Sequence, residues 1–129
     1  MDFDDYRGRI EGIDKLAASG DDRALLAALT GLAASDLPDL DRARFWSQAA
    51  QAHERLGETD PALAAYDRAA ALETPYHRFQ AAFRKSDYLT RLGRKDESRD
   101  LLKDLLARPE ATLSERHAFE ARLKLLRRV

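Results

Sequence analysis

The chain has 129 residues, of which 44% are hydrophobic and 35% are charged, and its formal net charge at pH 7 is −1. This length suits one globular domain, and the absence of cysteine and asparagine excludes disulfides, cysteine-based metal sites and N-linked glycosylation. No apolar run reaches the roughly 18 residues of a membrane span, and no signal peptide opens the sequence, so we expect a cytoplasmic protein without membrane contact.

Two helices are expected in the first hairpin, at about residues 5–34. The first helix ends at Ser19, because the glycine that follows adopts the left-handed conformation of a helix C-cap at little cost. The second covers about 22–34. The segment 35–39, Ser-Asp-Leu-Pro-Asp, has the composition of a linker, and its proline suits the first turn of the next helix.

The stretch from Phe45 to Pro75 carries the most informative pattern. Large and small residues recur there at helical spacing, in the order Trp46, Ala49, Ala50, His53, Leu56, Gly57, Ala62, Tyr66, Ala69, Leu72 and Pro75. This order resembles one tetratricopeptide repeat, a helix–turn–helix unit of about 34 residues. It departs from the family pattern where leucine, glycine and tyrosine are usual, at Ala49, Ala50 and His53.

A packing argument explains why this second hairpin, at about residues 39–73, needs those residue types. Two antiparallel helices approach closely only where small side chains meet, and large side chains must fill the gaps above and below. We expect the helices to cross at Ala50, Ala62 and Ala69, with Trp46 and Tyr66 as fillers.

Glycines at regular spacing indicate three such units. Gly20, Gly57 and Gly93 stand 37 and 36 residues apart, and each lies between two predicted helices. The third hairpin covers about residues 75–107. Its first helix is expected to open at Thr74 and Pro75, a cap residue followed by proline.

A seventh helix is expected over about residues 113–128. Thr112 and Glu115 form a capping box at its start. Its apolar stripe should cover the exposed end of the third hairpin, and consists of Phe119, Leu123 and Leu126. The resemblance thus implies an all-α, right-handed tetratricopeptide-type solenoid of about seven antiparallel helices, in a single domain over residues 1–129.

The resemblance also implies a binding groove, because in this family the first helix of each unit lines a concave surface that recognises proteins or peptides. The polar stripes of the second and third units predict nine groove residues: Arg44, Gln48, Gln51, Arg55, Gln80, Phe83, Arg84, Asp87 and Arg91. Core packing is an equal alternative for Phe83. Since four arginines face one acid, we expect a non-enzymatic adaptor or scaffold whose groove prefers acidic segments.

Self-association is the alternative function. Residues 1–41 carry ten acids and four bases, a net charge of −6, whereas residues 74–129 carry eight acids and fourteen bases, a net charge of +6. In a solenoid the order in sequence is the order in space, so the molecule would have an acidic head and a basic tail that could dock between copies. We therefore expect a monomer or a weak homo-oligomer.

No catalytic, cofactor or metal site is predicted. The three histidines never stand three to five residues apart, and neither a glycine-rich phosphate loop nor a nucleophile elbow occurs. Basic residues of the last predicted helix could contact phosphate: Arg122, Lys124, Arg127 and Arg128. Because Glu115 and Glu120 are interleaved with them, a solvated helix face is favoured over a nucleic-acid interface.

Overall fold

Within residues 1–127, which the computed structural model describes, the chain forms seven α-helices, one short 3₁₀ turn and no strand. The elements are α1 (Phe3–Ser19), α2 (Asp22–Ala33), α3 (Asp39–Arg55), α4 (Thr59–Glu73), η1 (Thr74–Tyr76), α5 (Gln80–Arg91), α6 (Lys95–Leu106) and α7 (Leu113–Arg127). The expected all-α class and seven helices are confirmed. The expected last residue of the seventh helix, 128, lies outside the described residues.

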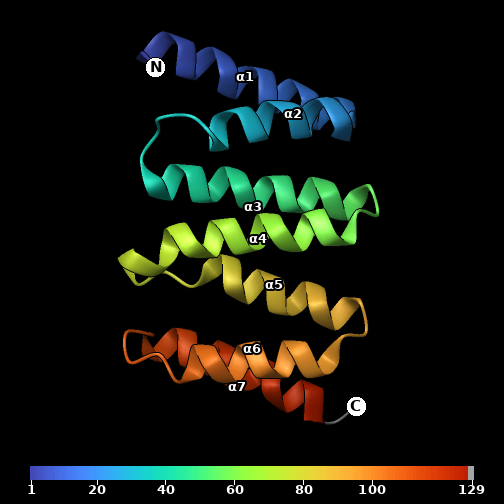
Figure 1. Ribbon diagram of the computed structural model, residues 1–129, viewed down its shortest axis with the longest axis vertical. Coiled ribbons are helices and arrows are strands. Elements are labelled where there is room, and N and C mark those ends of the chain that lie inside the picture. The colour runs from blue at the N-terminus through green and yellow to red at the C-terminus, as the bar shows by residue number, and fades with distance from the viewer. Residues whose placement is uncertain (128–129) are drawn as a thin grey trace.

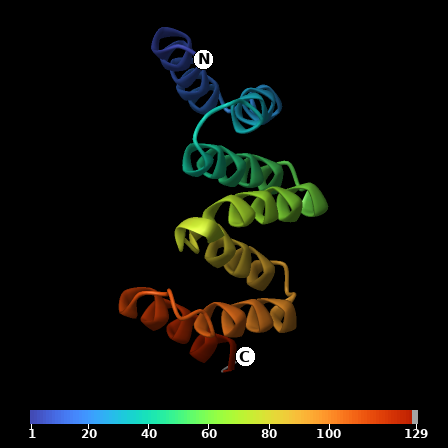
Figure 2. The same ribbon diagram turned by 60° about the vertical axis from the view of Figure 1, so that its left-hand side comes forward.

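The helices lie in a row that follows the order of the sequence. Each packs mainly against the helix before it and the helix after it, and the row extends along the long axis of the molecule, with the N-terminus and α7 at opposite ends (Figure 1). A second view shows that successive helices are inclined to one another (Figure 2). None of the helices within residues 1–127 is long and apolar enough to cross a membrane.

Glycines end three of the helices, as the sequence predicts. Gly20, Gly57 and Gly93 are left-handed, with φ angles of 77°, 74° and 81°. After α3, the backbone N–H of Glu58 donates to the carbonyl of His53 at 2.9 Å, which is the bond of a Schellman motif. Because other residues are strained at such φ angles, glycine determines where these helices end.

The start of α5 differs from the expectation. The sequence suggested a helix opening at Thr74 and Pro75, but α4 continues into η1, and the Thr74 hydroxyl donates back to the carbonyl of Ala70 at 2.8 Å. Proline is tolerated there because the first positions of a helical turn need no N–H donor. His77 then adopts a left-handed conformation with φ of 57°, and α5 begins only at Gln80.

Small side chains allow α3 and α4 to pack closely. Ala50, Ala62 and Ala69, the expected crossing points, are each 0% exposed. Tyr66 beside them is 2% exposed. Trp46 packs against three of the hydrophobic clusters, one shared with α1 and α2 and two shared with α4 and α5. The α3–α4 pair therefore connects the two ends of the molecule.

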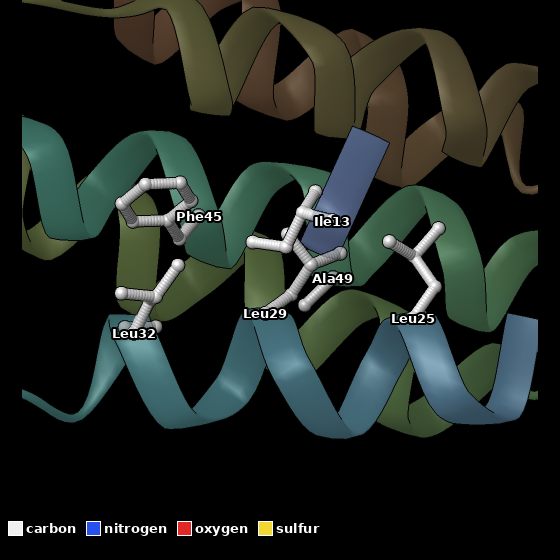
Figure 3. Packing of buried hydrophobic residues seen from close by; sticks show 7 residues of the cluster. Ile13, Leu25, Leu29, Leu32, Phe45 and Ala49 are labelled. Carbon is white, nitrogen blue, oxygen red and sulfur yellow. The ribbon is translucent and has the colours of Figure 1, made fainter. Parts of the chain in front are cut away.

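The cluster at the N-terminal end fills the space between α1, α2 and α3. Leu25, Leu29 and Leu32 project from α2 towards Ile13 of α1 and Phe45 of α3 (Figure 3). These five side chains are at most 7% exposed. Full burial of a large apolar side chain contributes roughly 1.5–3 kcal/mol, so this cluster anchors α1 to the row.

The cluster at the C-terminal end is covered by α7. Phe119, Leu123 and Leu126 are between 2% and 5% exposed, and they pack with Leu102 and Leu105 of α6. The apolar stripe predicted from the sequence therefore lies on the third hairpin.

Hydrogen bonds between side chains and the backbone hold the start of α7. The Thr112 N–H donates to the Glu115 carboxylate at 2.9 Å, and the Glu115 N–H donates to the Thr112 hydroxyl at 3.1 Å, which confirms the predicted capping box. The Arg116 guanidinium donates to three carbonyls of the α6–α7 connection, those of Leu106, Arg108 and Ala111.

Enlarging a crossing point should destabilise the fold. We expect Ala69→Leu to lower the free energy of unfolding by about 1–3 kcal/mol, because the added atoms have no space between α3 and α4. The matched control is Ala71→Leu at an exposed position of the same helix, where the change should stay within about 0.5 kcal/mol. Urea unfolding measures both, and equal effects would contradict close packing at Ala69.

Phe119→Ala tests the cover formed by α7. We expect it to lower the free energy of unfolding by about 3–5 kcal/mol, because it leaves a cavity in the cluster at the C-terminal end. Leu125→Ala, at a side chain that is 51% exposed, is the control and should change little. A chain ending after Pro109 should aggregate or melt far earlier. An unchanged, monomeric truncated chain would show that the cover is dispensable.

Candidate functional site

Two adjoining clefts open on the face formed mainly by α3, α5 and α7. The first cleft, of about 770 Å³, is lined by α3, the connection between α4 and α5, the start of α5 and the first turns of α7. The second cleft, of about 540 Å³, lies between the C-terminal parts of α3 and α5. Gln51 and Arg84 line both, so the two clefts form one continuous groove.

All nine predicted groove residues line this groove. Arg44, Gln48, Gln80 and Phe83 line the first cleft, Arg55, Asp87 and Arg91 line the second, and Gln51 and Arg84 line both. They come together because residues three or four apart share one face of a helix, and those faces of α3 and α5 adjoin. That this groove binds a partner stays a prediction.

The wall of the first cleft is aromatic. The rings of Phe83 and Phe119 lie with centroids 5.3 Å apart at an angle of 54°, a tilted arrangement that aromatic pairs favour. Phe79, which is 5% exposed, also lines the cleft. Phe83 thus packs against α7 and borders the cleft at the same time, which joins the two interpretations that the sequence left open.

An internal network occupies the second cleft. The Arg91 guanidinium donates to the Glu54 carboxylate at 2.8 Å. The Tyr66 hydroxyl donates to the same carboxylate, and burial together with this hydrogen bond raises the pKa of Tyr66. One carboxylate therefore serves two donors from neighbouring helices, and the Arg91 charge is balanced within the chain.

Two further charges of the second cleft are also paired. Arg55 donates to the Asp22 carboxylate of α2 at 2.9 Å. Asp87 accepts from Arg122 of α7, also at 2.9 Å. Of the four arginines expected to face a ligand, Arg55 and Arg91 are therefore engaged with carboxylates of the chain itself.

Four polar contacts join side chains that stand 35 to 38 residues apart in sequence. The pairs are Tyr6–Arg44, Asp39–Tyr76, Glu54–Arg91 and Asp87–Arg122, with separations of 38, 37, 37 and 35 residues. They link α1 to α3, α3 to η1 and α5, and α5 to α7. Because exposed polar pairs contribute only about 0–1 kcal/mol, these contacts orient neighbouring units more than they stabilise them.

The first cleft retains guanidinium groups that make no direct contact with a carboxylate of residues 1–127. Arg44 donates to the Tyr6 hydroxyl at 3.2 Å. Arg84 is half-buried and Arg78 is exposed, and neither side chain forms a hydrogen bond or ion pair within the part of the chain that the structure describes. Arg78 is not among the residues predicted from the sequence. A helix that opens at Pro75 does not indicate the left-handed turn at His77, which places Arg78 at the cleft.

A buried carboxyl group lies at the base of the first cleft. Glu73, the last residue of α4, is 7% exposed and accepts the N–H of Ala81 at 2.8 Å. It caps α5 in place of Phe79, which holds the N-cap position but has no polar group. Burial raises the pKa of Glu73, and the Ala81 N–H and the charges of Arg84 and Arg78 partly oppose this rise.

The remaining candidate groups have structural partners. The His53 ring Nδ1 lies 2.9 Å from Glu58, which also pairs with Arg23 at 2.9 Å. Hydrogen bonds from His53 and Arg23 lower the pKa of Glu58. Within residues 1–127 no group of three or more histidine, aspartate or glutamate side chains is placed to hold a metal ion. Of the basic residues considered for phosphate contact, Arg122 is paired with Asp87, and Arg128 lies outside the described residues.

No protein-family model matches this chain, and no curated protein matches it significantly. The function is therefore inferred from the geometry and chemistry of the groove.

The buried Glu73 should make stability depend on pH. In the unfolded chain this carboxyl has its ordinary pKa of 4.5, and in the folded protein the pKa is higher. The folded state therefore holds the proton more tightly, and the contribution of Glu73 to stability is present below pH 4.5 and is lost as pH rises through the folded-state pKa.

Glu73→Gln tests this, because glutamine keeps an oxygen for the Ala81 N–H and cannot ionise. The free energy of unfolding of the wild type, relative to this variant, should fall as pH rises from below 4.5 to neutrality. Glu110→Gln, at an exposed loop position, is the control and should show no such fall. A relative stability that rises with pH would mean that the helix N-terminus and the arginines outweigh burial.

Proposed function

We propose that this chain is a non-enzymatic binding module of the tetratricopeptide type, in which a right-handed solenoid of antiparallel helix pairs presents a groove to an acidic protein or peptide segment. Its role is that of an adaptor or scaffold. The solenoid is supported by glycines at repeat spacing, by alanines at the α3–α4 crossing and by polar contacts between side chains one repeat apart.

The composition of the first cleft carries this proposal. Three guanidinium groups, those of Arg44, Arg78 and Arg84, line this cleft together with the half-buried ring of Phe83. They outnumber the two carboxyl groups of the lining, those of Glu73 and Glu115. A guanidinium can hold a carboxylate through two charge-assisted hydrogen bonds, and an apolar surface beside it lowers the competition from water. A cleft of about 770 Å³ is within the range of ligand sites. The ligand that fits is an acidic side chain next to an apolar one.

The continuation into the second cleft favours an extended ligand. Gln48 lines the first cleft and Gln51 lines both clefts, and their amides can both donate to and accept from a peptide backbone. The second cleft has its charges paired internally, so it suits neutral residues of the ligand. Acidic residues should therefore lie against the first cleft.

Reversing two charges of the first cleft should abolish most of the binding. Because a hydrogen bond to a charged group contributes about 1.5–3 kcal/mol, we expect Arg44→Glu with Arg84→Glu to weaken binding at least about tenfold. The measurement is fluorescence anisotropy with a library of peptides that place aspartate or glutamate next to an aromatic residue. Circular dichroism should show unchanged helix content, because neither side chain belongs to a hydrophobic cluster.

Lys103→Glu with Lys124→Glu is the matched control, since it reverses two exposed charges that line neither cleft. This variant should bind the peptides almost as the wild type does. Equal losses in both double variants would indicate non-specific attraction, and unchanged binding by the Arg44 and Arg84 variant would place recognition on another surface.

A further inference from the structure

The first turn of α1 presents an exposed phenylalanine among carboxylates. Phe3 is 72% exposed, more than any other large hydrophobic side chain within residues 1–127. Asp2 caps the helix by accepting the Asp5 N–H at 2.8 Å. The carboxylates of Asp4 and Asp5 have guanidinium groups only at 3.4 and 3.7 Å, on the same exposed helix. Such pairs contribute little, so these carboxylates are free to exchange partners.

Other exposed apolar side chains lack this combination. Leu113 and Leu125 belong to α7, in the basic part of the chain, and Leu40 lines the first cleft itself. Tyr76 is 47% exposed, but its hydroxyl already donates to Asp39 at 2.9 Å. Within the described chain, Phe3 is the exposed aromatic residue that has several aspartates next to it in sequence, and the Arg7 guanidinium lies 5.5 Å from the centroid of its ring.

This segment complements the first cleft in charge, and both carry an aromatic side chain. The cleft offers the half-buried ring of Phe83, which stands beside the buried Phe79 and Phe119, and guanidinium groups at Arg44 and Arg84 that make no direct contact with a carboxylate of residues 1–127. We infer that the first cleft receives the first turn of α1 from a second copy of this chain. Phe3 then lies on the aromatic wall, and the neighbouring aspartates meet the arginines. The inference rests on the proposed function and names the partner of the same cleft.

The occupant comes from another molecule because α1 cannot fill the cleft of its own chain. Ile13 holds α1 in the cluster with α2 and α3, and Tyr6 lies at the rim, where its hydroxyl accepts from Arg44 at 3.2 Å. In this arrangement Phe3 remains exposed and lines neither cleft. Docking of a second copy exchanges the Arg44–Tyr6 hydrogen bond, in which only the donor is charged, for a pair with a carboxylate in which both groups are charged, which is stronger.

The resulting contact is heterologous, since the first turn of α1 of one copy meets the first cleft of the next. In a dimer, one copy still has an unoccupied first cleft and the other still has an unbound first turn of α1. Association therefore continues as concentration rises, unless the rotation between successive copies closes a ring. The net charge of −6 over residues 1–41 and of +6 over residues 74–129 steers the encounter, and added salt screens it.

Complementation between two variants of the full chain tests the inference. Phe3→Ser removes the aromatic ring from the first turn of α1 and leaves the cleft intact. Arg84→Glu reverses a charge in the cleft and leaves the first turn of α1 intact. In sedimentation, the wild type should associate with rising concentration and dissociate with salt, and each variant alone should associate at least about tenfold more weakly. An equimolar mixture of the two variants should form one-to-one dimers, and no assembly larger than a dimer should appear.

Leu125→Ser is the matched control, because it removes an exposed apolar side chain outside both clefts, and it should associate as the wild type does. A wild type that stays monomeric at every concentration would overturn the inference. Association that survives Phe3→Ser, or a variant mixture without dimers, would do the same.

A peptide with the sequence of residues 1–9 separates this inference from the proposed function. Binding of this peptide to the full-length Phe3→Ser chain, with loss on adding Arg84→Glu, supports both. If peptides of the acidic–aromatic library bind and the peptide of residues 1–9 does not, the groove still binds acidic segments but the partner is not a second copy. If no acidic peptide binds, both proposals fall.

Discussion

Close approach of α3 and α4 is the constraint on which the rest of the structure depends. Ala50, Ala62 and Ala69 have no exposed surface, and in a close-packed interior a larger side chain at these positions would force the two helices apart. This pairing places Trp46 where it packs with clusters on both sides of the pair. It also directs the polar side of α3 towards α5, and the groove forms between these two helices because their apolar sides are used for packing.

Charges on the groove face divide between two roles. In the second cleft, Arg91 and Glu54 balance each other, and Asp87 is balanced by Arg122. In the first cleft, Arg44 and Arg84 make no direct contact with a carboxylate of residues 1–127. With Arg78 they outnumber the two carboxyl groups of this cleft, those of Glu73 and Glu115, so an excess of positive charge lies near the start of α5 and α7. Since α7 also supplies Phe119 to the wall, one helix covers the last cluster and completes the cleft.

Glu73 couples the fold to this cleft. Its carboxyl accepts the Ala81 N–H and so holds the start of α5, while the same group lies at the base of the cleft beside Arg78 and Arg84. A proton on Glu73 removes a negative charge near these two arginines, and burial of the carboxyl group favours this neutral form. The charge of the cleft thus depends in part on a side chain that also caps α5.

The sequence by itself determined the features that depend on local interactions. Helices ended at Gly57 and Gly93, and the capping box formed at Thr112, because these signals act within a few residues. Helical periodicity alone sets which groove residues share a face of α3 and which share a face of α5, whereas the packing of the helices brings these two faces together. Tertiary structure decided the pairing of charges, since Arg55 meets a carboxylate 33 residues away and Arg91 meets one 37 residues away. It also decided the late start of α5, which required a buried carboxylate from α4 to cap a helix whose own first residues carry no cap.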